Sequence, residues 1–304
     1  MKVAWCTLAG LVLSQAGVAQ DSRRTLAKTD GTTVVCVTWN NRTFTYHSAI
    51  EGSSLITGDA EFAAIDAAFA SWQALSNTCS DFTFVAGPRV TSPSSGKGSE
   101  RQNVVVFRES ACAQVVPQSD PCLSDGSCSA VYGCWSHSST TIGLTSVTYS
   151  TRTGIAVDAD IELNGADFVF TTVASPPCAQ GSALANCVAY DVQNTMTHEI
   201  GHVVGFDHVA NPNSTMAPTA PMGETSKRII DLGTADGFCS TYPRGQPPTP
   251  CDEQLKRRVV ANTAGTVACS ASGGGAAVLW VTVFLGAAAP RRRRLTRMGA
   301  RLQG

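Results

Sequence analysis

The chain has 304 residues, of which 43% are hydrophobic and 15% are charged, which suits one ordinary globular domain with appendages at either end. Its formal net charge of −1 includes Lys2 and six arginines between positions 291 and 301, which we expect the mature protein to lose. The remaining 15 basic and 23 acidic residues give a net charge of −8, which argues against nucleic acid as a partner.

The first nineteen residues are typical of a secretory signal peptide. Lys2 precedes a mostly apolar run over residues 3–13, and the small residues 16–19 form a cleavage site. A buried N-terminal helix is the alternative, but no polar residues divide the run into two faces. We therefore expect an exported protein, at the cell surface or extracellular, in which residues 20–32 form a short N-terminal segment.

Cysteine usage agrees with export. Twelve cysteines are present, and setting aside Cys6 in the signal and Cys269 in the tail leaves an even number, which allows up to five disulfide bonds. No CxxC pair occurs, so a thiolate zinc site or a thioredoxin-like redox centre has little support. The ten cysteines are Cys36, Cys79, Cys112, Cys122, Cys128, Cys134, Cys178, Cys187, Cys239 and Cys251.

The first elements of the domain follow from hydrophobic periodicity. Alternation over residues 33–47 predicts two short strands joined by a turn at Asn40 and Asn41, forming a hairpin. Asp59 can cap a helix in which apolar residues recur at three- and four-residue steps and should face a sheet. Those residues are Phe62, Ile65, Phe69 and Trp72.

Strands and one helix are predicted in the central part of the chain. Residues 108–137 contain four cysteines, several serines and two prolines without periodicity, so we interpret them as a loop insertion tied by disulfides. The predicted strands are 82–85, 104–107, 142–149 and 155–163, and the helix is 191–204.

The composition changes abruptly after Tyr242, where a proline-rich stretch indicates a stiff linker. We therefore expect a domain over residues 33–243 and a linker over 244–268. The tail, 269–304, contains Cys269, a mostly apolar run over 276–289 and a block of arginines.

This tail resembles the MYXO-CTERM type of C-terminal sorting signal, in which a cysteine motif precedes a hydrophobic helix and a basic end. The resemblance implies cleavage near Cys269 and retention at the cell surface. A plain membrane anchor is the alternative, although the run over 276–289 is shorter than the about twenty residues that a spanning helix needs. In either case the arginines would stay on the cytoplasmic side, and contact with a membrane would occur only through the tail.

Three of the five histidines lie in the stretch HEIGHVVGFDH, residues 198–208. His198 and His202 are four residues apart on the predicted helix, so both imidazoles can reach one ion. Gly205 can adopt the positive φ that ends a helix, which lets the chain turn and bring His208 back as a third ligand. Three neutral imidazoles leave one position of a tetrahedral zinc open, as in catalytic sites, and Glu199 lies beside it.

The pattern HExxHxxGxxH matches the metzincin signature, and Met216 within STMAP resembles the Met-turn of that family. Within the metzincins the chain resembles the matrixins over about residues 33–243. The resemblance implies an α+β, zincin-like fold with a twisted mixed sheet, an antiparallel edge strand, two long helices, the Met-turn and a C-terminal helix. It also implies that Met216 forms an apolar floor beneath the zinc; a core methionine is the alternative.

The resemblance implies a zinc-dependent endopeptidase that acts on a protein or peptide substrate, as a monomer. Zinc held by His198, His202 and His208 would activate a water molecule, and Glu199 would serve as general base and acid. The competing hypothesis is a non-catalytic, zinc-braced surface adhesion module, which would have no need of Glu199. A histidine cluster without metal is a third interpretation.

Acidic residues precede the active-site helix. Asp158, Asp160 and Glu162 alternate along one strand and share a face, where matrixins place calcium-binding carboxylates, so Ca²⁺ is a second expected ion. A solvated polar face of an edge strand is the alternative. The free edge of the same strand would pair with an extended substrate.

The residues after Met216 are expected to line the substrate pocket: Ala217, Pro218, Thr219 and Pro221. The chain also departs from the matrixin pattern. No cysteine switch precedes the domain, so Cys36 is better interpreted as a disulfide partner than as a latency ligand. Only His47 and His137 remain outside the motif, which makes a second, structural zinc doubtful.

Overall fold

The computed structural model describes residues 22–29, 33–91, 102–125, 127–179, 181–184, 186–251 and 276–282. The predicted signal peptide lies outside these residues, as do positions 252–275 and 283–304 of the predicted linker and tail. The expectations of signal cleavage and of sorting at Cys269 therefore remain predictions.

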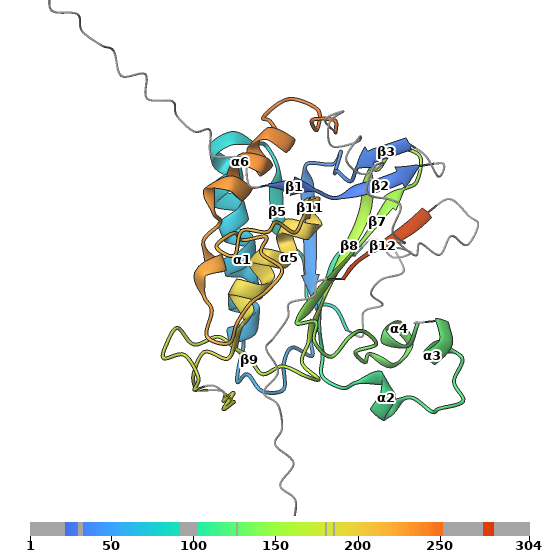
Figure 1. The fold of residues 1–304 in the computed structure, drawn as a ribbon, viewed down its shortest axis with the longest axis vertical. Helices are drawn as coiled ribbons and strands as arrows, with labels where there is room; N and C mark the ends of the chain where they lie inside the picture. Colours follow the sequence, from blue (N-terminus) through green and yellow to red (C-terminus); the bar gives the residue numbers. More distant parts are fainter. Residues whose placement is uncertain are drawn as a thin grey trace, which may run out of the picture.

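A mixed six-stranded sheet forms the centre of the molecule, in the order β12-β7-β8-β6-β4-β5 (Figure 1). The four strands β8, β6, β4 and β5 run parallel to one another, whereas β7 is antiparallel to β8 and β12 is antiparallel to β7. The predicted α+β class with a mixed sheet is confirmed and is compatible with a matrixin-type fold. The strands are β4 (Thr43–Ser48), β5 (Thr83–Ala86), β6 (Val104–Arg108), β7 (Gly143–Ser150), β8 (Ala156–Asn164) and β12 (Ala276–Thr282).

Helices α1 (Ala60–Cys79), α5 (Val192–Val203) and α6 (Leu232–Thr241) gather on one side of this sheet (Figure 1). The predicted apolar stripe of α1 is confirmed, because all four of its side chains are buried. Trp72 is fully buried and its indole N–H donates to Thr197 O at 2.9 Å. Burying such a side chain contributes about 2–3 kcal/mol, so this contact ties α1 firmly to α5.

The hairpin predicted for residues 33–47 is wrong. Strand β3 (Thr33–Cys36) pairs with β2 (Leu26–Thr29), whereas β4 pairs with β5 and β6. The reason is that β4 continues through α1 into β5 as a parallel crossover unit, which takes β4 into the central sheet.

The insertion between β6 and β7 consists of three short helices on the side of the sheet away from α1 (Figure 1). Disulfides Cys112–Cys134 and Cys122–Cys128 close it, which confirms a disulfide-tied insertion. The helices are α2 (Cys112–Val115), α3 (Cys122–Asp125) and α4 (Cys128–Tyr132).

All ten cysteines between the predicted signal peptide and the predicted tail form disulfides. Cys36 pairs with Cys251, so the interpretation of Cys36 as a disulfide partner is confirmed; the other bonds are Cys79–Cys239 and Cys178–Cys187. The first residues of the predicted linker therefore lie against the domain. Thr249 N also donates to Thr241 O at 2.9 Å.

The prediction that β8 has a free edge is wrong, because β7 and β6 flank it on either side. The outer edge of β7 instead pairs with β12, from Ala276 opposite Ser150 to Thr282 opposite Leu144. The first half of the predicted tail helix is thus a strand. Its β-branched and aromatic residues favour extended structure, and the edge of β7 supplies hydrogen-bond partners. In the described ranges, no helix has the length and apolarity needed to cross a membrane.

Short elements complete the description. Strand β1 (Arg23–Arg24) is antiparallel to β11 (Phe206–Asp207), and β9 (Phe170–Thr171) is parallel to β10 (Tyr190–Asp191). A single 3₁₀ turn covers Ser226–Arg228.

Candidate metal centre

Helix α5 holds two of the three histidines. Its N-cap, Asp191, accepts a hydrogen bond from Asn194 N at 2.7 Å and is paired with Arg228. The helix ends at Val203, and Gly205 then adopts a φ of +92°. A side chain at position 205 would also come within 2.4 Å of Val37 O, so only glycine allows this turn. The predicted glycine bend is confirmed.

The bend brings the third histidine to the other two. The Nε2 atoms of His198, His202 and His208 form a nearly equilateral triangle with sides of 3.2, 3.2 and 3.3 Å. Three nitrogens bound to one tetrahedral zinc at about 2.05 Å would lie roughly 3.3 Å apart, so the triangle fits such an ion. Within the described part of the chain, these three histidines are the group whose potential ligand atoms lie close enough together to bind one metal ion.

The tautomers of two rings are determined by their backbone partners. His198 Nδ1 lies 2.6 Å from Thr215 O, and His202 Nδ1 lies 2.7 Å from Phe206 O. A carbonyl can only accept, so each Nδ1 carries the proton and each Nε2 presents a lone pair to the centre. Two lone pairs 3.2 Å apart repel unless a cation lies between them. The ring orientations therefore fit a metal better than a metal-free cluster.

Burial keeps these rings neutral. Burial and the neighbouring histidines lower the pKa of His198 well below its usual value, and burial together with His208 lowers the pKa of His202 to about 3. Burial also lowers the pKa of His208. Neutral imidazole is the form that binds a metal ion, so the site is prepared for one at neutral pH.

Glu199 is fully buried beside this triangle. Thr145 Oγ1 donates to its Oε2 at 2.6 Å, and its Oε1 has no hydrogen-bond partner among the described residues. Burial raises the pKa of Glu199 to about 8, and the Thr145 hydrogen bond opposes that rise. A divalent cation held by the three imidazoles would favour the ionised carboxylate further.

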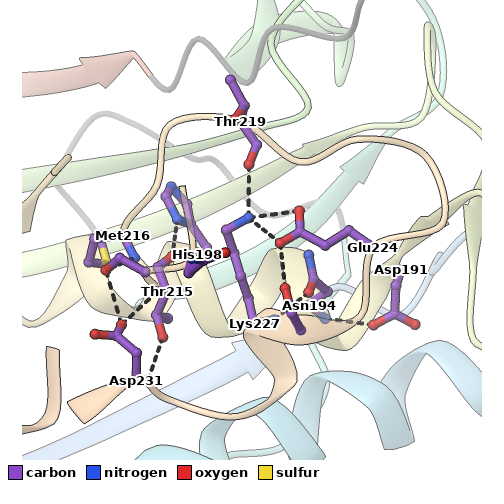
Figure 2. A network of polar contacts seen from close by, with 12 residues as sticks. Asp191, Asn194, His198, Thr215, Met216, Thr219, Glu224, Lys227 and Asp231 are labelled. Atoms are coloured by element: carbon purple, nitrogen blue, oxygen red, sulfur yellow. Dashed lines mark hydrogen bonds and ion pairs between the residues drawn. The ribbon is translucent and has the colours of Figure 1, made fainter. Parts of the chain in front are cut away.

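Met216 packs against α5 at Gly201, which lies between His198 and His202 in the sequence. It is fully buried, and a side chain at Gly201 would come within 2.2 Å of its sulfur, so glycine at 201 is what allows the contact. Thr215, next to Met216, supplies the carbonyl that orients His198. Asp231 holds this turn, since its Oδ2 accepts from Thr215 N at 2.7 Å and Ser214 Oγ at 3.0 Å (Figure 2). Asp231 was not predicted from the sequence as part of this site, although its position as a helix N-cap is a recognisable signal.

A buried lysine ties the segment after Met216 back to α5. Lys227 Nζ donates to Thr219 O at 2.8 Å and to the two carboxylate oxygens of Glu224 at 2.7 and 2.8 Å, and Lys227 N donates to Asn194 Oδ1 (Figure 2). Lys227 was also not predicted from the sequence, because its contact with α5, through Asn194, spans 33 positions. Of the predicted pocket residues, Ala217 is buried, Pro218 is half-buried, and Thr219 and Pro221 are exposed.

The expected calcium carboxylates lie on one face of β8, but they are neither solvated nor convergent on an ion. Asp158, Asp160 and Glu162 are 3%, 3% and 1% exposed, which excludes a solvated face. Asp160 accepts from Val104 N at 2.8 Å, and Glu162 pairs with Arg108 and His137. These protein groups take the place of a cation, so the described residues give calcium no support.

Residues 136–239 match the Matrixin family model. The matched segment contains β7, β8, α5 and Met216, and hence the three histidines and Glu199. It supports a matrixin-like metallopeptidase domain, and matrixins use a catalytic zinc. No curated protein matches the chain.

Proposed function

We propose that this chain is an exported zinc endopeptidase in which His198, His202 and His208 hold the metal and Glu199 is the general base. The observation that carries the proposal is the Nε2 triangle, with sides of 3.2 to 3.3 Å, next to the buried carboxylate of Glu199. A zinc site that only stabilises the fold needs three or four ligands but no buried acid beside them. Burying an acid that has no catalytic role costs free energy.

When bound, zinc lowers the pKa of a water molecule and polarises the carbonyl to be cleaved. Glu199 accepts the proton of the attacking water and returns it to the nitrogen of the leaving amine. His198 and His202 keep their lone pairs aimed at the metal through Nδ1–H bonds to backbone carbonyls. Met216 supplies an apolar support behind them.

An extended peptide is the substrate that this geometry suits. Strand β7 carries Thr145 on the face toward Glu199, and its outer edge offers backbone groups for an added strand. Strand β12 uses this edge, so substrate and β12 compete for it. A chain cut near Cys269, as the tail's resemblance implies, would lack β12 and leave the edge open. Five disulfides suit the oxidising compartment that export would provide.

The test is digestion of casein by residues 20–268, with zinc content measured on the same sample. We expect about one zinc per chain. Digestion should stop with 1,10-phenanthroline and resume with added zinc. Glu199→Gln should lose about 10²-fold or more in kcat at unchanged zinc content. Glu51→Gln changes an exposed carboxylate far from Glu199 in the sequence. It is the matched control and should behave as wild type.

Zinc-loaded wild type that digests neither casein nor gelatin would refute the peptidase and favour the adhesion module. Full turnover in Glu199→Gln would refute the role of that carboxylate alone.

A further inference from the structure

The carboxylate of Glu199 must be held in one orientation if it is to move a proton, and the three histidines do not hold it. Among the described residues, its side chain has one hydrogen-bond partner, the hydroxyl of Thr145. Thr145 lies 54 positions earlier in the chain and is itself fully buried. The contact therefore joins α5 to β7, the strand whose outer edge pairs with β12.

The hydroxyl has two oxygens of Glu199 within reach. Thr145 Oγ1 is 2.6 Å from Oε2 and 3.2 Å from the backbone carbonyl of Glu199. A hydroxyl has one proton to donate. The shorter contact is with the carboxylate oxygen Oε2, and hydrogen bonds to an ionised acceptor are the stronger ones. Oε2 is thus engaged, and Oε1 remains for another partner.

Gly143 shapes the other side of the same carboxylate. It lies two positions before Thr145, so both residues are on the face of β7 that contacts Glu199 of α5. A side chain at position 143 would come within 2.7 Å of Glu199 Oε1. Strand β7 thus holds one carboxylate oxygen with a donor and leaves room for the other by lacking a side chain.

We propose that Thr145 is the positioning residue of the general base, with Gly143 as its steric counterpart: Thr145 anchors Oε2, so that Oε1 is the atom that exchanges the proton. This inference rests on the proposed function. As the water oxygen bonds to the carbonyl carbon, the water O–H bond breaks and its proton forms an O–H bond at Oε1, while the Thr145 hydrogen bond to Oε2 persists. That O–H bond then breaks as the proton passes to the leaving nitrogen and the C–N bond breaks, so Glu199 ends ionised as it began.

The experiment uses purified zinc-loaded protein and steady-state kinetics on one peptide substrate. Thr145→Val keeps the shape but removes the donor, and Thr145→Ser keeps the donor. Gly143→Ala leaves the hydrogen bond possible but pushes on Oε1. Thr148→Val makes the same chemical change as Thr145→Val on the opposite face of β7, where no hydrogen bond of the Thr148 side chain is found in the described structure, and serves as the matched control.

We expect Thr145→Val and Gly143→Ala to lose about tenfold to hundredfold in kcat, with KM and zinc content unchanged. Thr145→Ser should recover most of the wild-type kcat, and Thr148→Val should match wild type. A purely structural role would instead lower zinc content or melting temperature in step with activity, and would not be rescued selectively by serine.

Wild-type kcat in soluble Thr145→Val, or a loss explained by missing zinc, overturns the inference while an active wild type leaves the proposed function intact. Should Thr145→Val fail to fold, a crystal structure of zinc-loaded wild type decides: an Oγ1–Oε2 separation beyond about 3.5 Å overturns the inference, and a hydrogen bond supports it. An inactive, zinc-loaded wild type would instead remove the proposed function on which the inference rests.

Discussion

At the scale of single residues, buried polar groups are arranged so that each has a defined protonation state. The Nδ1–H groups of His198 and His202 point at carbonyls, which leaves the lone pairs of Nε2 for a metal. On the opposite face of the sheet, Glu162 has Arg108 Nε at 2.5 Å and His137 Nε2 at 3.5 Å. This second buried carboxylate is paired within the protein, so we assign it to stability and not to catalysis.

The pairing of Glu162 predicts how stability depends on pH. Burial opposes ionisation, but the hydrogen bond from His137 and the charge of Arg108 outweigh it and lower the pKa of Glu162 to about 2. Because the folded-state pKa lies below the usual value of 4.5, the stabilisation is present above about pH 5 and is lost as the pH falls toward 2. Urea titrations should show the free energy of unfolding declining over this window, with a smaller slope in Glu162→Gln. Equal slopes in both proteins would contradict the assignment.

At the scale of elements, the start of α6 determines the shape of the turn around Met216. Asp231 caps α6 through Thr234 N at 3.1 Å and holds Thr215 N and Ser214 Oγ with its other oxygen. Helix α1 offers a contrast, because its N-cap, Asp59, makes no such side-chain bond. Both helices begin after an aspartate, but only the side chain of Asp231 caps its helix.

Asp231→Ala should therefore weaken the metal site as well as the helix. The released Thr215 no longer fixes the carbonyl that orients His198, so we expect zinc affinity to fall about tenfold or more and the free energy of unfolding to fall by about 1–2 kcal/mol. Zinc competition titration and thermal melts measure the two effects. Asp59→Ala is the control and should change neither zinc affinity nor the free energy of unfolding. A normal zinc affinity in Asp231→Ala would show that the turn around Met216 keeps its shape without Asp231.

The pairing of β12 with β7 predicts that the tail limits access to the site. Residues 20–268 lack β12, so an extended substrate can pair with β7 without displacing it. We expect kcat/KM for casein to be at least about threefold higher for 20–268 than for 20–304, since main-chain pairing is worth on the order of 1 kcal/mol. Adding the separate peptide 276–282 in excess should lower the activity of 20–268. Identical kcat/KM values for the two chains would show that β12 does not restrict substrate.

At the scale of the whole molecule, disulfides join segments that are far apart in sequence. Cys79–Cys239 connects the end of α1 to α6 across 160 positions, and Cys36–Cys251 connects β3 to the residues after α6 across 215. Such bonds restrict the unfolded chain more than the Cys122–Cys128 bond, which spans 6 positions within the insertion.

Removing the long-range bond should cost more than removing the short one. Cys79→Ala with Cys239→Ala should lower the free energy of unfolding by about 5 kcal/mol at most, and Cys122→Ala with Cys128→Ala by about 2 kcal/mol, on loop-closure entropy. Denaturant unfolding of both double variants checks the order. A larger loss from the short bond would mean that the insertion, and not α1 with α6, limits stability.

Features that depend on residue spacing within one element follow from the sequence alone. The four-residue step from His198 to His202, the bend at Gly205 and the return of His208 follow from helix geometry and the permitted φ of glycine, so the convergence of the three imidazoles was predictable. The apolar stripe of α1 and the central strands were predictable for the same reason, because a period is a local property.

Which distant segments meet follows from tertiary packing and not from local sequence patterns. Thr145 reaches Glu199 across 54 positions, and its placement on the inward face was the one available signal: a polar residue where the strand pattern calls for an apolar one. The partners of β3, β4 and β12, the loss of a free edge at β8 and the pairing of ten cysteines were likewise undetermined by periodicity. Each depends on competition between alternative long-range contacts, whose outcome is set by packing and chain closure.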